Sequence, residues 1–244
     1  MSINSRLGVA PIITLSLLIL LLPLQASARA EATAGAGNRA PVANTAPPRK
    51  AAQLAYVMMS DANSVAVIDQ ATHAVRATIA VEGVPHGGAL TPDGRRLYMA
   101  NMGGTRLSVV DTSAQRLLQT IDVGSISHHM ATSADGRFLY VAAKELLQID
   151  TATNTIVGAI ELSEAPFDLQ VAPDGRTLYV LNMGRTLSVV DLQSHTEVAV
   201  IPVGRSMMGH VAVSPDGSRL YVTDDRDNTL SVIDTTLLET RIQK

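Results

Sequence analysis

The sequence contains no cysteine among its 244 residues. Disulfide bonds, thiolate metal sites and covalent haem attachment through a Cys-x-x-Cys-His motif are therefore excluded for this chain. A lipid anchor on an N-terminal cysteine is excluded for the same reason. The stability of the folded part must come from packing.

Aromatic residues and net charge are also scarce. Tryptophan is absent, aromatic residues make up 3% of the chain, and the formal net charge is −3. Domains that bind nucleic acids usually carry basic stripes and aromatic stacking platforms, so no nucleic-acid partner is expected. The sequence also lacks a Ser-His-Asp order, an HExxH motif and a glycine-rich phosphate loop, which removes the most recognisable catalytic classes.

The N-terminus predicts an export signal over residues 1–30. Arg6 supplies positive charge, and the run from Ile12 to Leu22 is apolar apart from two hydroxyl residues. Small residues between Ala26 and Ala30 fit either of two cleavage sites. The apolar run is short for a membrane span, which needs about 20 residues. Cleavage would leave a periplasmic or secreted protein without a membrane span; an uncleaved anchor is the alternative.

Two segments follow the predicted signal. Residues 31–53 are rich in alanine, glycine, proline and asparagine and show no apolar period, which predicts a flexible linker. Residues 54–244 carry the periodic apolar runs and are long enough for one domain, a β-propeller repeat domain by the argument that follows.

A hairpin signal is written four times in this domain. Pro-Asp-Gly, or Ala-Asp-Gly, joins two apolar runs, and these residues suit a tight turn in which glycine accepts a positive φ. The copies are TPDGRRLYM (91–99), SADGRFLYV (133–141), APDGRTLYV (172–180) and SPDGSRLYV (214–222). The tyrosines of the second strand stand at Tyr56, Tyr98, Tyr140, Tyr179 and Tyr221, with spacings of 42, 42, 39 and 42 residues. A period of about 40 residues with four strand-sized segments indicates propeller blades.

One unit shows the expected blade. Between Ser125 and Glu161, strands are predicted at about 128–133, 138–143, 146–150 and 156–161. An aspartate closes the third strand of every unit, and we expect these carboxylates to hold turns rather than metal. They are Asp69, Asp111, Asp150, Asp191 and Asp234. This unit is three residues short, because its loop is reduced to about residues 143–145.

The repeated residues resemble a known family. YVTDDRDNTLSVIDT, which begins at Tyr221, together with SPDGSRLYV, strongly resembles the YVTN-type β-propeller repeat, and the resemblance covers about Tyr56 to Thr240. It implies four-stranded blades whose innermost strand, before Pro-Asp-Gly, lies along a central channel. It also implies export and seven blades, as in proteins similar to quinoprotein amine dehydrogenase propellers, a haem-binding nitrite reductase propeller or a lactonase. Such a resemblance fixes fold better than function.

We therefore expect an all-β propeller with about five four-stranded blades. The first unit lacks its inner strand, and the last is expected to finish its fourth strand at Ile242-Gln243-Lys244. Five units cannot close a seven-bladed ring. The chain could close as a five-bladed ring with linker residues near 40–50, be a piece of a longer propeller, or assemble with another chain. The break at Lys244 favours the second, which predicts an open, self-associating array.

Polar residues recur where the inner strands begin. His86 and His128 lie seven positions before the aspartate of their turn, and His129, Asp168 and His210 lie six positions before theirs. Imidazole and carboxylate groups can bind a divalent metal or titrate near neutral pH. The one-position offset, however, should point neighbouring side chains to opposite faces. The five residues are therefore a candidate ligand or metal site, of unknown metal and cofactor, and a purely structural ring of histidines is the favoured alternative.

Two functional hypotheses remain. The favoured one is a non-enzymatic exported scaffold that binds a protein partner, another copy or a small ligand through its loops and channel mouth. The alternative is an enzyme or cofactor-associated subunit, quinoprotein dehydrogenase-like or lactonase-like. That alternative needs convergent acid–base or metal groups, which only the histidine and aspartate set could supply, and no catalytic residue is assigned.

The export signal generates the first testable prediction. Protein recovered from the periplasm or medium should begin near Arg29 or Glu31, because the small residues of the cleavage site follow the apolar run directly. N-terminal sequencing checks this. A mature protein that begins at Met1 or Ser2 would show that no signal is removed.

Overall fold

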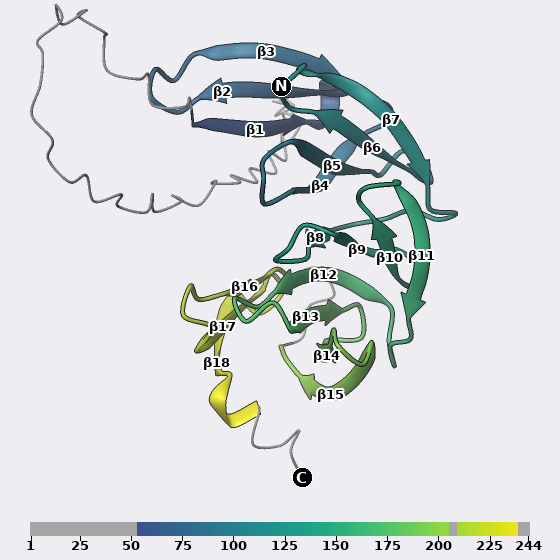
Figure 1. Ribbon diagram of the computed structural model, residues 1–244. Coiled ribbons are helices and arrows are strands. Elements are labelled where there is room, and N and C mark those ends of the chain that lie inside the picture. The colour runs from purple at the N-terminus through teal and green to yellow at the C-terminus, as the bar shows by residue number, and fades with distance from the viewer. Residues whose placement is uncertain (1–52, 205–208, 239–244) are drawn as a thin grey trace, which may run out of the picture.

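The computed structural model describes residues 53–204 and 209–238. The predicted export signal and all but the last residue of the predicted linker lie outside these ranges. Within them, no helix is both long and apolar enough to cross a membrane. The described residues form eighteen strands in five antiparallel sheets, each built from consecutive strands (Figure 1).

The sheets at the two ends of this array contain three strands each. The first contains β1 (Leu54–Met59), β2 (Ser64–Asp69) and β3 (Val75–Ala80), with the single turn η1 (Ser60–Ala62) after β1. The fifth contains β16 (Val211–Val213), β17 (Arg219–Asp224) and β18 (Thr229–Asp234).

The three middle sheets contain four strands each. The second contains β4 (Pro85–Leu90), β5 (Arg96–Asn101), β6 (Arg106–Asp111) and β7 (Arg116–Asp122). The third contains β8 (Met130–Thr132), β9 (Phe138–Ala142), β10 (Leu146–Asp150) and β11 (Thr155–Ile160). The fourth contains β12 (Pro166–Val171), β13 (Thr177–Asn182), β14 (Thr186–Asp191) and β15 (Thr196–Pro202).

The sheets follow one another along an open arc, from β1–β3 to β16–β18 (Figure 1). In each four-stranded sheet the strand order is the chain order, or its reverse. The first strands of neighbouring sheets contact one another, β4 with β8, β8 with β12, and β12 with β16. These sheets are the blades of the predicted all-β propeller, and the first described blade lacks an inner strand, as expected.

The fourth strand predicted for the last blade, ending at Ile242-Gln243-Lys244, lies outside the described residues. In the blade before it, β15 begins five residues after Asp191, and the same spacing after Asp234 leads to residue 239. The described chain ends before that point with helical backbone at Thr236–Leu238. The Leu238 side chain is buried in the apolar cluster between the last two blades, and its N–H donates to the carbonyl of Thr235.

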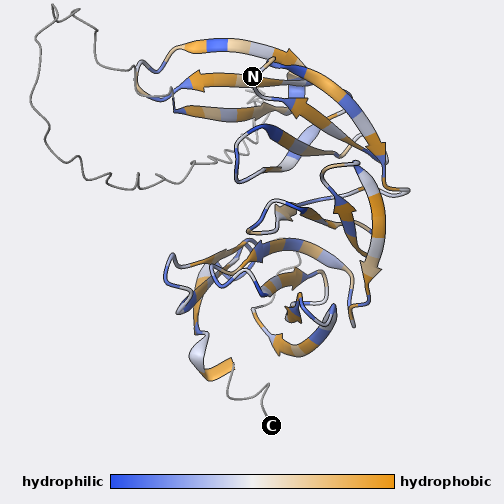
Figure 2. Cartoon of the chain, in the orientation of Figure 1, coloured by the Kyte–Doolittle hydropathy of each residue, from blue (hydrophilic) through white to orange (hydrophobic). Residues whose placement is uncertain are grey.

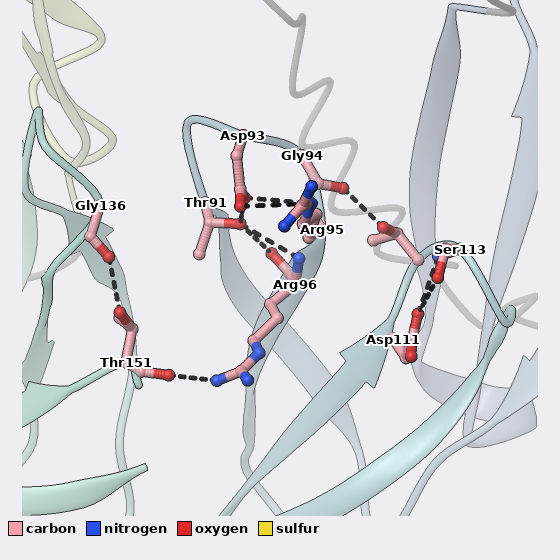
Figure 3. A network of polar contacts seen from close by, with 10 residues as sticks. Thr91, Asp93, Gly94, Arg95, Arg96, Asp111, Ser113, Gly136 and Thr151 are labelled. Atoms are coloured by element: carbon pink, nitrogen blue, oxygen red, sulfur yellow. Dashed lines mark hydrogen bonds and ion pairs between the residues drawn. The ribbon is translucent and has the colours of Figure 1, made fainter. Parts of the chain in front are cut away.

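The recurrent aspartates hold turns, as predicted. Asp93 Oδ1 accepts hydrogen bonds from Thr91 Oγ1 at 2.6 Å and from the N–H of Arg95 at 3.0 Å (Figure 3). Gly94, the next residue, has a φ of 70°, which side-chain-bearing residues rarely adopt. The same figure shows Asp111 Oδ1 accepting from Ser113, so strand-closing aspartates act in the same way.

Polar contacts also join one blade to the next. The Arg96 guanidinium of the second blade donates to the carbonyl of Thr151 in the third (Figure 3). The buried hydroxyl of Tyr98 donates to Asn154 Oδ1 at 2.7 Å across the same boundary. The repeated tyrosine thus brings a large apolar ring into the blade and carries a hydrogen bond to its neighbour.

The apolar core lies between the blades. Hydrophobic residues run along the strands of all five sheets (Figure 2), and the buried ones form four clusters. The cluster between the second and third blades, for example, joins Leu107 and Val109 to Leu139 and Val141. Each middle blade is therefore covered on both faces by its neighbours.

The last described blade lacks this cover on one side. Leu230 and Val232 of β18 are 56% and 55% exposed, whereas the equivalent Leu187 and Val189 of β14 are 0% and 1% exposed. The residue types are identical and only the neighbour differs. Burial of these positions thus depends on the presence of a following blade.

This contrast generates a matched pair of variants. Val189→Asp should destabilise the domain by about 4 kcal/mol or more, because it places an unpaired charge between two blades. Val232→Asp introduces the same change at the equivalent exposed position and should leave the free energy of unfolding within about 1 kcal/mol of the parent. Denaturant unfolding followed by circular dichroism measures both. Equal effects of the two substitutions would contradict the assignment of blade faces.

Candidate functional site

The five predicted site residues lie where the chain enters four successive inner strands. His86 is the second residue of β4, His128 and His129 precede β8, Asp168 lies in β12, and His210 precedes β16. Because β4, β8, β12 and β16 contact one another in order, their entry points share one end of the array. We call this region the channel mouth.

Two register positions supply the channel mouth. Six residues before the turn aspartate, the four blades carry Gly87, His129, Asp168 and His210. One residue earlier they carry His86, His128, Phe167 and Gly209. Sequence reasoning had singled out the polar members and had missed Phe167 and Gly87.

Bulges allow both positions to face the same space. The pairing of β12 with β13 shifts between Pro166 and Asp168, and that of β4 with β5 shifts between Pro85 and Gly88. At β9, Ala142 accepts a hydrogen bond from the N–H of His128 and donates one to the carbonyl of His129. An extra residue in one strand rotates the residues that follow. The expectation that adjacent positions would point to opposite faces is therefore wrong here.

The side chains at these positions form one aromatic cluster. The ring centroid of His129 lies 5.2 Å from that of His86, 5.0 Å from that of His210 and 5.5 Å from that of Phe167, and each pair has an edge-to-face arrangement. The ring centroid of His128 lies 5.0 Å from that of Phe167, in a tilted arrangement. Phe167 thus serves as the apolar support for imidazoles from two other blades.

Gly87 makes room for this cluster. A Cβ atom at this residue would lie 2.3 Å from the carbonyl oxygen of His128 and 2.9 Å from Nδ1 of His129. At the register position where the other three blades carry His or Asp, only glycine therefore fits in the second blade. Its hydrogen side chain lets β4 approach the chain that enters β8.

Asp168 is the electrostatic centre of the mouth. It is 7% exposed, and it accepts hydrogen bonds from the N–H of Leu169 at 2.9 Å, the N–H of Val211 at 3.0 Å and His210 Nδ1 at 3.2 Å. Burial would raise the pKa of Asp168, but the hydrogen bond from His210, the nearby His129 and the Val211 N–H together lower it below its ordinary value. The carboxylate is therefore held as an anion inside the protein.

The histidines respond to this anion differently. The hydrogen bond to Asp168 raises the pKa of His210 above its ordinary value, although burial opposes this. Burial lowers the pKa of His129 to about 4, and Asp168 only partly offsets it. Burial also lowers the pKa of His86 and of His128. Three of the four imidazoles are thus neutral at neutral pH and keep a lone pair for a ligand.

Several imidazole nitrogens have no hydrogen-bond partner among the described residues. They are His86 Nδ1, His128 Nδ1 and His129 Nε2, and each of these atoms is buried. Buried polar atoms are nearly always paired in folded proteins. The channel mouth therefore has unused capacity for a hydrogen-bonding or metal-containing ligand.

The structure brings three of the five predicted residues within metal-binding reach. Donor atoms of His129, Asp168 and His210 all lie within 4.8 Å of one another. His86 and His128 are not part of this group, and they reach the cluster through ring contacts instead.

Comparison with protein families gives a partial match. The model of the Cytochrome D1 heme domain matches residues 49–149, which is less than half of the chain. The matched segment includes His86, His128 and His129 but not Asp168 or His210. No curated protein matches the sequence.

Comparison with solved structures supports the propeller fold. The chain is similar to a chain of Kuenenia stuttgartiensis hydrazine synthase (TM-score 0.68, 27% identity), covering 75% of this chain and 60% of that one. It is similar to the Cps50 (Swd1) β-propeller domain of Myceliophteria thermophila (0.66, 11%; 74% and 62% covered). A functionally unknown protein from Desulfotomaculum acetoxidans DSM 771 is also similar (0.62, 17%; 74% and 65% covered). The chain thus spans less than two thirds of each matched chain's length.

The packing of Gly87 can be tested directly. Gly87→Ala should destabilise the domain by about 1–3 kcal/mol, because the added methyl group overlaps the backbone of the third blade. Gly104→Ala is the matched control, since a Cβ atom there has no atom within 4 Å. Thermal unfolding followed by circular dichroism compares the two variants. A Gly87→Ala protein as stable as Gly104→Ala would show that the inner strands do not approach one another as described.

Proposed function

We propose that the protein is a non-enzymatic β-propeller that binds a small ligand at its channel mouth, and that a haem-type group is the leading candidate for that ligand. The observation that carries the proposal is the convergence of neutral imidazoles with buried, unpartnered nitrogens at the ends of neighbouring inner strands. Export to the periplasm or medium, and membership of the YVTN-type repeat family, belong to the same proposal.

The chemistry of the mouth suits recognition. His86, His128 and Phe167 present flat aromatic surfaces, and Asp168 supplies one fixed negative charge. Phe167 and Asp168 are buried and His86 and His128 are partly buried, so their positions are set by the blades rather than by mobile loops. A preorganised site of this kind lowers the entropic cost of binding a rigid ligand.

The family comparison favours haem over other flat ligands. The segment matched by the haem-domain model contains three of the four mouth histidines, and imidazole is a common axial ligand of haem iron. Without cysteine, any attachment would be non-covalent. His86, His128 and His129 fit such a group, since each has a buried nitrogen without a partner among the described residues. When bound, haem would supply redox chemistry, while these residues would orient it and exclude water.

A second candidate is an enzyme or cofactor-associated subunit of the quinoprotein dehydrogenase-like or lactonase-like kind. One observation favours it, the pairing of His210 with Asp168, because a carboxylate that raises the pKa of a histidine is also the arrangement of a general base. His210 is the exposed member of the cluster and could reach a substrate.

A haemin titration tests the proposal. The purified mature chain should shift the Soret absorption of haemin saturably, with one equivalent bound, because the imidazoles form a single cluster. His86→Ala and His129→Ala should weaken binding at least about tenfold, since each removes an imidazole that would hold the group. His195→Asn is the matched control, because His195 is exposed and lies on a turn at a φ of 56°, which asparagine tolerates.

Two results would contradict the proposal of haem at the channel mouth. One is the absence of saturable binding. The other is binding that the mouth variants and His195→Asn affect equally, because the ligand would then lie elsewhere on the protein.

A further inference from the structure

We infer that His129, Asp168 and His210 form a binding site for a divalent first-row transition-metal ion such as Zn²⁺. The three residues come from three successive blades, and their inner strands are in contact. This inference rests on the proposed function, because it uses the same channel mouth. It adds a metal ion as a second class of ligand, which would be bound without His86 or His128.

The distances between the donor atoms carry the inference. His129 Nδ1 lies 3.6 Å from Asp168 Oδ1, and His210 Nδ1 lies 3.2 Å from Asp168 Oδ2. In a tetrahedral zinc site with bonds of about 2.0–2.2 Å, neighbouring ligand atoms are about 3.3–3.6 Å apart. The separation between His129 and Asp168 lies in this range, and the separation between His210 and the other oxygen of the same carboxylate is slightly shorter. All three donors lie within 4.8 Å of one another, so a small adjustment of the partly exposed His210 ring would bring them around one ion.

The contact between His129 and Asp168 is hard to explain without a shared ligand. At 3.6 Å it is too long for a hydrogen bond. The other ring nitrogen of His129, Nε2, is buried and has no partner among the described residues. Among the described residues, the carboxylate 3.6 Å away is the contact recorded for Nδ1, and an ion between Nδ1 and Oδ1 would join the two groups.

Asp168 is prepared for such a role by its backbone contacts. Its Oδ1 accepts from the N–H of Leu169 and its Oδ2 from the N–H of Val211. A carboxylate oxygen has two lone pairs, and each oxygen also has an imidazole nearby, His129 at Oδ1 and His210 at Oδ2. Supporting hydrogen bonds of this kind orient the ligands of a metal.

The donor set indicates the class of metal. Two imidazoles and one carboxylate suit Zn²⁺ and other first-row transition ions, whereas Ca²⁺ and Mg²⁺ prefer shells of oxygen atoms. Three protein ligands leave one position of a tetrahedral ion open. Water or an anionic group of a further ligand would take that position, and His210, the exposed member of the set, leaves the site open to solvent.

Calorimetric titration of the tag-free mature chain with Zn²⁺, after removal of metal by chelation and dialysis, tests the inference. One equivalent should bind. His129→Ala, Asp168→Asn and His210→Ala should each weaken binding by at least about tenfold, the lower end of the loss caused by removing even a supporting residue of a metal site. Co²⁺ in place of Zn²⁺ should give intense visible absorption typical of four-coordinate cobalt, and the same variants should abolish it.

Neighbouring histidines supply the controls. His128→Ala changes the residue next to His129 but lies outside the donor group, so Zn²⁺ affinity should stay within about twofold of the parent. His195→Asn controls for adventitious binding at exposed imidazoles. Because Asp168→Asn removes a buried acceptor and could unfold the protein, His210→Ala, at a side chain that is mostly exposed, remains the decisive variant. Circular dichroism checks that each variant is folded.

The outcomes separate this inference from the proposed function. Absence of Zn²⁺ binding, or binding that His210→Ala and His128→Ala weaken equally, would overturn the metal site. Haemin binding that persists in that case would leave the proposed function standing. Stoichiometric Zn²⁺ binding that only the three ligand variants abolish would support the metal site even if haemin does not bind.

Discussion

The burial of one blade face by the next is the constraint on which the rest of this structure depends. A blade is a single twisted sheet with apolar residues on both faces, and in a chain without cysteine no disulfide can stabilise it. The four apolar clusters all lie between blades. The same stacking that fills these clusters brings the inner strands into contact, and it thereby sets which side chains meet at the channel mouth.

At the channel mouth, the packing of the blades buries polar residues and changes their charge states. Burial disfavours charge on every group there, and it keeps His86, His128 and His129 neutral. Asp168 nevertheless stays ionised, because two backbone N–H groups and His210 compensate for the loss of water. The result is one anion that is hydrogen-bonded to His210 and lies near three neutral rings. Burying these polar groups costs more free energy than burying apolar side chains in the same place would. The unpartnered nitrogens therefore indicate that the cluster serves a function other than stability.

The sequence was a good guide to features that repeat. The tyrosine spacing and the turn residues predicted the blades, the missing inner strand of the first unit and the shortened loop at residues 143–145, because each depends on local turn chemistry or on counting. The register of His129, Asp168 and His210 was visible for the same reason. The bulges at Phe167 and Gly87 were not, since they depend on how two strands pair. A turn after Asp234 was predicted, but the burial of Leu238 in it was not, since that depends on a tertiary contact.

The residues of the channel mouth come from separate blades, so the site can change by substitutions in one blade at a time. Four blades each contribute one residue at the same register position, Gly87, His129, Asp168 or His210, on a backbone that is otherwise repeated. A substitution of the exposed His210 alters one donor and leaves the packing of the blades intact, whereas at Gly87 a larger side chain would overlap the third blade. Each of these blades therefore supplies its own residue to the site. Single substitutions can change the chemistry of the site during evolution while the propeller scaffold stays the same.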